Sequence, residues 1–268
     1  MLAKKWRNYN EDVTMEFTDL LYRTDGPLAV LSLNRPEMKN AFTLPMLDSI
    51  CRALRLATAD PQIKVILLTG EGNAFSAGGN VKDMAAGDLR LWEMKNYLWD
   101  HVQRVPQGLA EVDKPVLAVI DGPAYGGGFD LALACDFRFA SDQATFCSTF
   151  VRIGLAPGNG GAYFLPRLVG RGKALDILLT GRVVRMEEAL SLGLVDRVVP
   201  PDQLMAVATS YARDIAQWPL SSIRAIKRAV AQGEKCDLRS HLDYLSSQLA
   251  LLTDTAEHRD AVKQLVGD

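Results

Sequence analysis

Three consecutive glycines, Gly126 to Gly128, limit the folding of this chain more than any other feature of its sequence. An apolar run ending at Ile120 precedes them and another beginning at Phe129 follows, which predicts a buried strand, a tight turn and a helix. Glycine has no Cβ, so the backbone here can approach a second segment or a ligand closely. The run therefore predicts either a close contact between strand and helix or a site where backbone amides bind an oxyanion.

Asp130 stands two residues beyond the glycines and supplies a carboxylate to the same region. The first turn of the predicted helix can direct this side chain toward the space in front of the glycine amides. A carboxylate beside an oxyanion site can add or remove a proton during a reaction. Asp130 is therefore the first candidate for a general acid or base.

Strands and helices alternate through the first part of the chain. Short apolar runs predict strands at 28–33, 65–69, 116–120, 136–140 and 145–147. Helical spacing of apolar residues predicts helices at 43–59, 89–108 and 129–135. This alternation is typical of an α/β fold with right-handed crossovers.

From about residue 165 onward the pattern becomes helical. Helices are predicted at 166–179, 186–192, 201–217, 220–232, 238–252 and 255–266. No linker rich in Pro or Ser separates the two parts, so we expect an α/β core with a helical region packed on it. A C-terminal region of this kind is often a surface for oligomerisation.

Charge and cysteine content exclude several classes of protein. The formal net charge is −2, which argues against nucleic acid and anionic membranes as partners. The four Cys contain no CxxC pair and the three His form no metal-like pair, so we expect reduced thiols and no metal. The charged N-terminal segment does not resemble a signal peptide, and no apolar run reaches the ~18 residues of a membrane helix. These features predict a cytoplasmic protein.

Five short motifs then follow one another in a defined order. They are Leu33–Phe42 (LNRPEMKNAF), Phe75–Met84 (FSAGGNVKDM), Ile120–Asp136 (IDGPAYGGGFDLALACD), Ile153–Gly161 (IGLAPGNGG) with Phe164–Gly170 (FLPRLVG), and Leu179–Val198 (LTGRVVRMEEALSLGLVDRV). In this order and spacing they resemble the crotonase (enoyl-CoA hydratase/isomerase) superfamily over nearly the whole chain.

The resemblance implies an α/β fold in which ββα units form a spiral, followed by a C-terminal helical region. The spiral core is expected at residues 1–200 and a helical trimerisation region at 201–268. The assembly implied is a homotrimer or a dimer of trimers. The implied substrate is an acyl-CoA thioester, so that coenzyme A belongs to the substrate and no separate cofactor is expected.

In this family two backbone amides hold the thioester oxygen while an enolate forms. The matching positions here are Gly79 and Gly127. Removal of one such donor typically costs about 2.7–4 kcal/mol of transition-state stabilisation. The positions that bind CoA in the family correspond to Lys39, Asn40, Ala41, Ser76 and Ala77.

The chain departs from the hydratases of this family at one position. Those enzymes hold a water between two glutamates, whereas here Asp130 occupies the first position and Phe150 the second. A phenyl ring cannot transfer a proton, and a drier pocket raises the pKa of a carboxyl group. Asp130 is therefore expected to be the single catalytic acid/base, with Phe150 and Asn159 contacting the substrate.

One carboxylate leaves several reactions open. They are hydration by another route, isomerisation of a double bond, and cleavage of a C–C or thioester bond. A catalytically weak acyl-CoA-binding protein is an alternative of a different class. RNA binding, which one branch of the superfamily shows, is disfavoured because the chain is nearly neutral.

Overall fold

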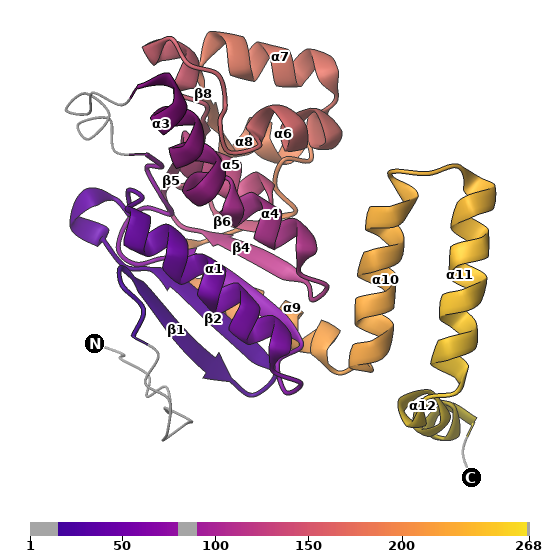
Figure 1. Ribbon diagram of the computed structural model, residues 1–268. Helices are drawn as coiled ribbons and strands as arrows, with labels where there is room; N and C mark the ends of the chain where they lie inside the picture. The colour runs from indigo at the N-terminus through magenta and orange to yellow at the C-terminus, as the bar shows by residue number, and fades with distance from the viewer. Residues whose placement is uncertain (1–15, 80–89, 267–268) are drawn as a thin grey trace.

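The computed structural model describes residues 16–79 and 90–266, and its centre is a sheet of six strands in the order β1-β2-β3-β4-β6-β9 (Figure 1). β1 pairs antiparallel with β2, and every other pairing in this sheet is parallel. The strands are β1 (Leu20–Asp25), β2 (Leu28–Leu33), β3 (Val65–Gly70), β4 (Val116–Ile120), β6 (Phe137–Ser141) and β9 (Arg197–Val199).

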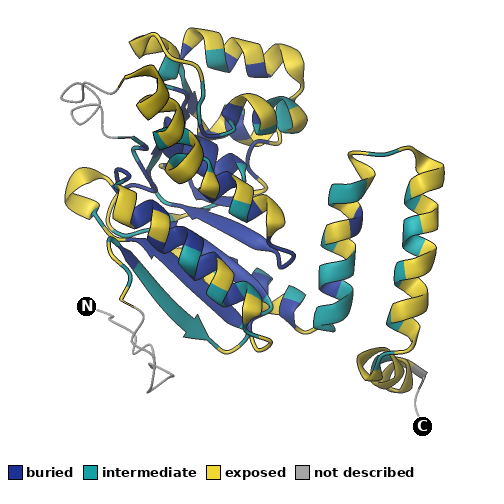
Figure 2. Ribbon diagram, viewed as in Figure 1, coloured by how far each residue is buried: buried dark blue, intermediate teal, exposed yellow. Residues whose placement is uncertain are grey.

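Helices cover both faces of this sheet. α1 (Leu44–Ala59) and α4 (Arg104–Glu111) pack together over one hydrophobic cluster, and α9 (Pro201–Ala216) packs on a second cluster against β2, β3, β4 and β6. All residues of β2 and β4 are buried, as the dark blue strands of Figure 2 show. Strands covered on both faces need nearly continuous apolar sequence, which is why these runs were recognisable.

A second, smaller sheet has the order β5-β7-β8. Its strands are β5 (Pro123–Tyr125), β7 (Thr145–Cys147) and β8 (Val183–Arg185). α5 (Gly127–Leu133) begins two residues after β5, and every residue of it is buried. The glycine run therefore lies at the junction of this small sheet and a buried helix, as the sequence indicates.

The helical stretch predicted at 89–108 consists of three segments. α3 (Leu91–Tyr97) passes into a π-helix at Leu98–Val102, and α4 follows. The amide of Gln103 donates to the carbonyl of Leu98 over 2.8 Å, which is the i to i+5 bond of a π-turn. Periodicity of apolar residues does not reveal such a turn.

The single helix predicted at 166–179 is wrong. The structure has two helices there, α6 (Gly161–Val169) and α7 (Arg171–Thr180), separated at Gly170, whose φ of 78° ends the right-handed helix. Strands β1, β5, β8 and β9 were not predicted. They are short or partly exposed, so they lack the continuous apolar run by which β2, β3 and β4 are recognised.

The last three helices lie apart from the sheet (Figure 1). They are α10 (Leu220–Gly233), α11 (Leu238–Thr253) and α12 (Ala256–Val266), whereas α9, the first helix after residue 200, belongs to the packing of the sheet. α10 contacts the core through ion pairs of its basic side chains with Asp113 and Asp136. No helix among the described residues is both long and apolar enough to cross a membrane. The domain division at residue 200 and the trimer remain predictions.

Candidate active site

The segment Ser76–Gly79 runs alongside the glycine run. Tyr125 N donates to Ser76 O over 2.8 Å, and Phe42 N donates to Gly78 O over 2.8 Å. Gly78 has a φ of 77°, and a Cβ atom there would lie 2.4 Å from Gly127 N. Only glycine permits this approach. The two amides that the sequence singles out, those of Gly79 and Gly127, are thereby brought onto adjacent segments.

Neither of these amides has an acceptor within the described part of the chain. Gly127 is the first residue of α5, where an amide has no partner inside its own helix. Gly79 pairs with Phe42 through a bridge in which the bond among described residues is made by Phe42 N, so the Gly79 amide is not used. Two unpaired amides on adjacent segments, one of them at a helix N-terminus, suit an oxygen that carries negative charge.

A loop on the other side holds the Ser76–Gly79 segment in place. Ser76 Oγ donates to Asn40 O over 2.8 Å and accepts from Gly78 N over 3.1 Å. Ala77 N donates to Lys39 O over 2.8 Å. Both Lys39 and Asn40 have left-handed backbones, with φ of 51° and 53°. The five positions predicted to bind CoA therefore lie on two hydrogen-bonded neighbouring segments, with Ala41 buried beside Asn40.

The side chains in this group differ in what they can offer a ligand. Asn40 is fully buried. Its Nδ2 donates to Glu71 O over 2.9 Å and to Ala74 O over 2.8 Å, and its Oδ1 accepts from Arg35 N over 2.9 Å. The Ser76 hydroxyl is likewise used internally. Lys39 is exposed. The asparagine and the serine therefore shape the backbone, and the lysine is the cation available to a ligand.

Asp130 lies on α5 with no exposed surface. Its Oδ2 accepts a hydrogen bond from Asn159 N over 3.3 Å, and its Oδ1 has no partner in the described part of the chain. The carboxyl group packs so closely on Gly161 that a Cβ atom there would lie 2.1 Å from Oδ1. The first residue of α6 must therefore be glycine for Asp130 to occupy this place.

Burial raises the pKa of Asp130 to about 7. The neighbouring amides of Gly161 and Asn159 favour the ionised form and offset part of this effect. Of the two, only the Asn159 amide makes a hydrogen bond to the carboxyl group, over 3.3 Å. Among the residues that the structure describes, no charged side chain contributes to the shift. A carboxyl group with a pKa near 7 exists in both protonation states at neutral pH, which suits acid/base catalysis.

Phe150 and Asn159 lie on two different segments, of which the first packs on the glycine run and the second donates a backbone hydrogen bond to Asp130. Phe150 opens a short 3-10 helix, Phe150–Ile153, after β7. That connection packs on the glycine run, since Gly126 N donates to Cys147 O over 2.8 Å and a Cβ at Gly126 would lie 2.9 Å from Thr149 Oγ1. Asn159 is 2% exposed, and both polar atoms of its side chain lack a partner among the described residues.

One contact near Asp130 involves a residue that the sequence did not single out. Gln103 Nε2 donates to Gly158 O over 2.9 Å. The two residues are 55 positions apart, and a glutamine inside a helix carries no motif. Only the fold reveals this contact.

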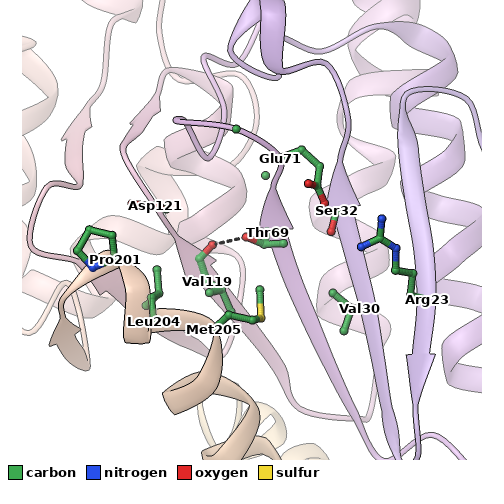
Figure 3. Close-up of a pocket in the computed structure, with 12 residues that line it drawn as sticks. Arg23, Val30, Ser32, Thr69, Glu71, Val119, Asp121, Pro201, Leu204 and Met205 are labelled. Carbon is green, nitrogen blue, oxygen red and sulfur yellow. Dashed lines mark hydrogen bonds between the residues drawn. The ribbon is translucent and has the colours of Figure 1, made fainter. Parts of the chain in front are cut away.

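A separate cavity of about 280 Å³ lies at the carboxyl ends of β2, β3 and β4, beside the start of α9 (Figure 3). Its charged lining residues are Arg23, Glu71 and Asp121. None of the residues predicted to act on substrate lines it, and the one hydrogen bond drawn there joins Thr69 Oγ1 to Val119 O over 2.9 Å. This cavity is therefore distinct from the candidate active site.

Comparison with known proteins gives a consistent family assignment. The family model described as enoyl-CoA hydratase/isomerase matches residues 23–266. A "Probable enoyl-CoA hydratase" of Rhizobium meliloti (strain 1021) is 34% identical over 254 residues, covering 94% of this chain and 96% of the relative. A "Trans-2-decenoyl-[acyl-carrier-protein] isomerase" of Streptococcus mutans is 32% identical over 247 residues, covering 91% and 94%.

Solved structures give the same result. The crystal structure of an enoyl-CoA hydratase from Bacillus anthracis superposes with a TM-score of 0.88 at 29% identity, covering 92% of this chain and 96% of that one. The family model, at residues 23–266, spans both the mixed α/β core and the C-terminal helices. The chain thus belongs to the enoyl-CoA hydratase/isomerase family, the crotonase superfamily, and has its fold.

Proposed function

We propose that this protein binds an acyl-CoA thioester, stabilises its enolate with the amides of Gly79 and Gly127, and moves a proton with Asp130 as the single acid/base. The observation that carries the proposal is the combination of two amides without an acceptor among the described residues and a buried carboxyl group whose pKa is raised to about 7. Membership of the enoyl-CoA hydratase/isomerase family supports an acyl-CoA substrate.

The two amides and the carboxyl group divide the chemistry between them. When Asp130 takes a proton from the carbon next to the thioester or from the carbon beyond the double bond, the electrons move onto the thioester oxygen. Hydrogen bonds from two fixed amides stabilise that oxygen, and the loss of either typically costs about 2.7–4 kcal/mol. Asp130 Oδ1, which has no hydrogen-bond partner in the described part of the chain, offers a lone pair for the proton.

Isomerisation of a double bond is the reaction that one carboxyl group serves best. Asp130 removes a proton from one carbon of the acyl chain and returns it to another, so that atoms and charge balance without a second acid. Hydration needs in addition a water that is held and deprotonated, and Phe150 cannot do this. The isomerase from Streptococcus mutans among the relatives supports this choice. Hydration remains the second candidate, because other relatives bear hydratase names.

The remaining predicted positions receive roles in binding. Lys39 is exposed and fits the phosphate groups of CoA, while the backbone of Asn40, Ala41 and Ala77 fits its pantetheine chain. The side chain of Phe150 and the unpartnered carboxamide of Asn159 are assigned to the acyl chain. A homotrimer with its contacts in the C-terminal helices is part of the proposal, and no cofactor beyond the CoA of the substrate is included.

Turnover of matched 2-enoyl and 3-enoyl-CoA thioesters by the wild type and by Asp130→Asn tests the proposal. NMR of the products separates isomers from 3-hydroxyacyl-CoA. We expect isomerisation by the wild type and a loss of about 10²–10⁴-fold in Asp130→Asn, the range that general acid–base groups contribute. Asp142→Asn, an exposed carboxylate outside the site, is the matched control and should be unchanged. Full turnover by Asp130→Asn would exclude Asp130 as the acid/base.

A further inference from the structure

We propose that Gln103 is a positioning residue for Asp130 and acts through the peptide group that joins Gly158 to Asn159. This inference rests on the proposed function, because it gives Gln103 a task in the proton transfer by Asp130. Gln103 itself does not touch the substrate in this proposal. Its effect reaches the carboxyl group through one peptide plane.

The geometry consists of two hydrogen bonds on opposite sides of that peptide. On one side Gln103 Nε2 donates to the carbonyl oxygen of Gly158 over 2.9 Å. On the other side the amide of Asn159 donates to Asp130 Oδ2 over 3.3 Å. The carbonyl and the amide belong to the same peptide group, so side chain, peptide and carboxylate form one continuous chain of hydrogen bonds.

The segment that carries this peptide has little else to fix it. Leu155–Gly160 contains no helix or strand. Among the described residues, Gln103 and Asp130 are the side chains from outside that make hydrogen bonds with it. A peptide plane whose carbonyl and N–H are both hydrogen-bonded cannot rotate without breaking one of the two hydrogen bonds. Gln103 therefore sets the direction in which the Asn159 amide points.

The π-turn before α4 explains how Gln103 reaches this peptide. In an α-helix, residues five apart point about 140° away from each other. The π-turn brings Leu98 and Gln103 onto one face of the helix, where the backbone N–H of Gln103 donates to Leu98 O over 2.8 Å. Both then reach Gly158, because a Cβ atom there would lie 3.8 Å from Leu98 Cδ2. π-turns are frequent at functional sites, and here the turn supplies a contact to the segment that holds the carboxylate.

Two consequences follow for Asp130. A hydrogen bond to the Gly158 carbonyl polarises the peptide and strengthens the donor on its other side. A stronger amide donor favours the ionised carboxylate, so Gln103 lowers the pKa of Asp130 from where burial alone would place it. The same contact keeps the carboxyl group at a fixed distance from the substrate, and small displacements of catalytic groups reduce rates strongly.

The test compares Gln103→Leu with Gln107→Leu, a matched control one turn further along α4 with an exposed side chain. The first measurement needs no substrate: infrared spectra across a pH series, each minus the spectrum of Asp130→Asn, isolate the carboxyl band of Asp130. We expect Gln103→Leu to raise the midpoint of this titration by about 0.1–0.7 pH unit, from a bond strengthened by roughly 10–30%. Gln107→Leu should leave it unchanged.

The second measurement is kinetic. Gln103→Leu should lower kcat by about 10–100-fold, the effect of a misplaced catalytic group, and move the pH profile upward while KM stays nearly constant. In the Asp130→Asn background the same substitution should have no further effect on the residual rate. Gln103→Met is the second variant, because its similar length preserves packing if leucine impairs folding.

The outcomes separate this inference from the proposed function. An unchanged carboxyl titration and unchanged kcat in a folded Gln103→Leu or Gln103→Met, with Asp130→Asn inactive, would overturn the role of Gln103 alone. Full activity of Asp130→Asn would instead overturn the proposed function, and the infrared titration would still decide whether Gln103 acts on Asp130. A loss of stability in Gln103→Leu with no change in the titration would make Gln103 a purely structural residue and contradict the proposal.

Discussion

Asp130 should make the stability of the fold depend on pH in a way that its replacement abolishes. Burial raises the pKa of Asp130 from 3.8 to about 7, so the folded state holds this proton more tightly than the unfolded state. The contribution of protonated Asp130 to the stability of the fold is therefore fully present below the unfolded pKa of Asp130. This contribution is lost as the pH rises from about 4 to about 7, and it changes no further above that.

The size of the effect follows from the gap between the two pKa values. At 1.36 kcal/mol for each pKa unit, ionisation of Asp130 costs the folded state about 4 kcal/mol at pH 8. About 2–3 kcal/mol of this loss falls between pH 5 and pH 8. Asn at position 130 cannot ionise, so Asp130→Asn should lack this part of the pH dependence. Between pH 5 and pH 8, Asp130→Asn should therefore lose less stability than the wild type.

Urea unfolding at one fixed protein concentration, at pH 5 and pH 8, measures the effect in both proteins. The concentration is fixed because association contributes to apparent stability. Subtraction of the Asp130→Asn profile from the wild-type profile cancels the other titrating groups. Asp142→Asn should reproduce the wild-type profile. If the wild type and Asp130→Asn lose the same stability between pH 5 and pH 8, the buried carboxyl group does not titrate near 7 and the reasoning is refuted.

Three further substitutions test other parts of the structure. Gly78→Ala should lower turnover by about 100-fold, because its Cβ would displace the Gly127 amide. Gly26 also has a positive φ, but no atom lies within 4 Å of its Cβ position, so Gly26→Ala should lower the free energy of unfolding by only about 1–2 kcal/mol and leave turnover unchanged. Asp113→Asn should lower the free energy of unfolding by about 1–3 kcal/mol in thermal or urea unfolding, because burial opposes ionisation of Asp113 but hydrogen bonds from two arginines of α10 outweigh it and hold its pKa below the usual range. This contribution is lost as the pH falls through the pKa of Asp113. Asp254→Asn, whose side chain is 95% exposed, is the control and should leave the stability unchanged. Phe150→Glu should raise the ratio of hydration to isomerisation in the NMR product assay, because a second carboxylate can hold a water. An unchanged ratio would contradict the proposal that residue 150 faces the substrate together with Asp130.

The contacts of α10 with the core combine charge and packing. Asp113 Oδ2 accepts from Arg224 Nε at 2.8 Å and also from Arg228, and Lys227 Nζ lies 2.6 Å from Asp136 Oδ2. Lys227 also donates to the carbonyl of Lys114 over 2.9 Å. The position of the C-terminal helices on the core therefore depends partly on ionic contacts.

The sequence predicts the centre of this fold well, for a physical reason. β2, β3 and β4 are buried on both faces and so carry continuous apolar runs, while α1 and α9 carry the helical spacing of a one-sided contact. The break at Gly170 escaped prediction, because apolar residues stand on both sides of it. The π-turn at Leu98–Val102 escaped because apolar spacing does not record a single inserted residue.

The sequence singles out Asp130 and the glycines of the candidate site, whereas the contacts around them depend on the tertiary fold. Gly78 and Gly127 stand where a Cβ would collide with backbone or a fixed ring, so their positions can be read from the chain. The sequence predicts a raised pKa for Asp130 from Phe150 at the second carboxylate position, but the contacts of Asp130 with Asn159 and Gly161 depend on how α6 meets α5. Gln103 lies outside every motif, since its contact arises from tertiary packing alone.

The close packing of Gly161 on Asp130 limits which positions of the candidate site can be substituted. A side chain at Gly78 or Gly161 would collide with the groups assigned to catalysis, so these positions offer no room for redesign. Leu98 Cδ2 would lie 3.8 Å from a Cβ atom at Gly158, which is an ordinary contact distance. A library meant to alter the range of acyl chains should therefore vary Leu98, together with Phe150, which is proposed to contact the acyl chain, and keep the glycines constant.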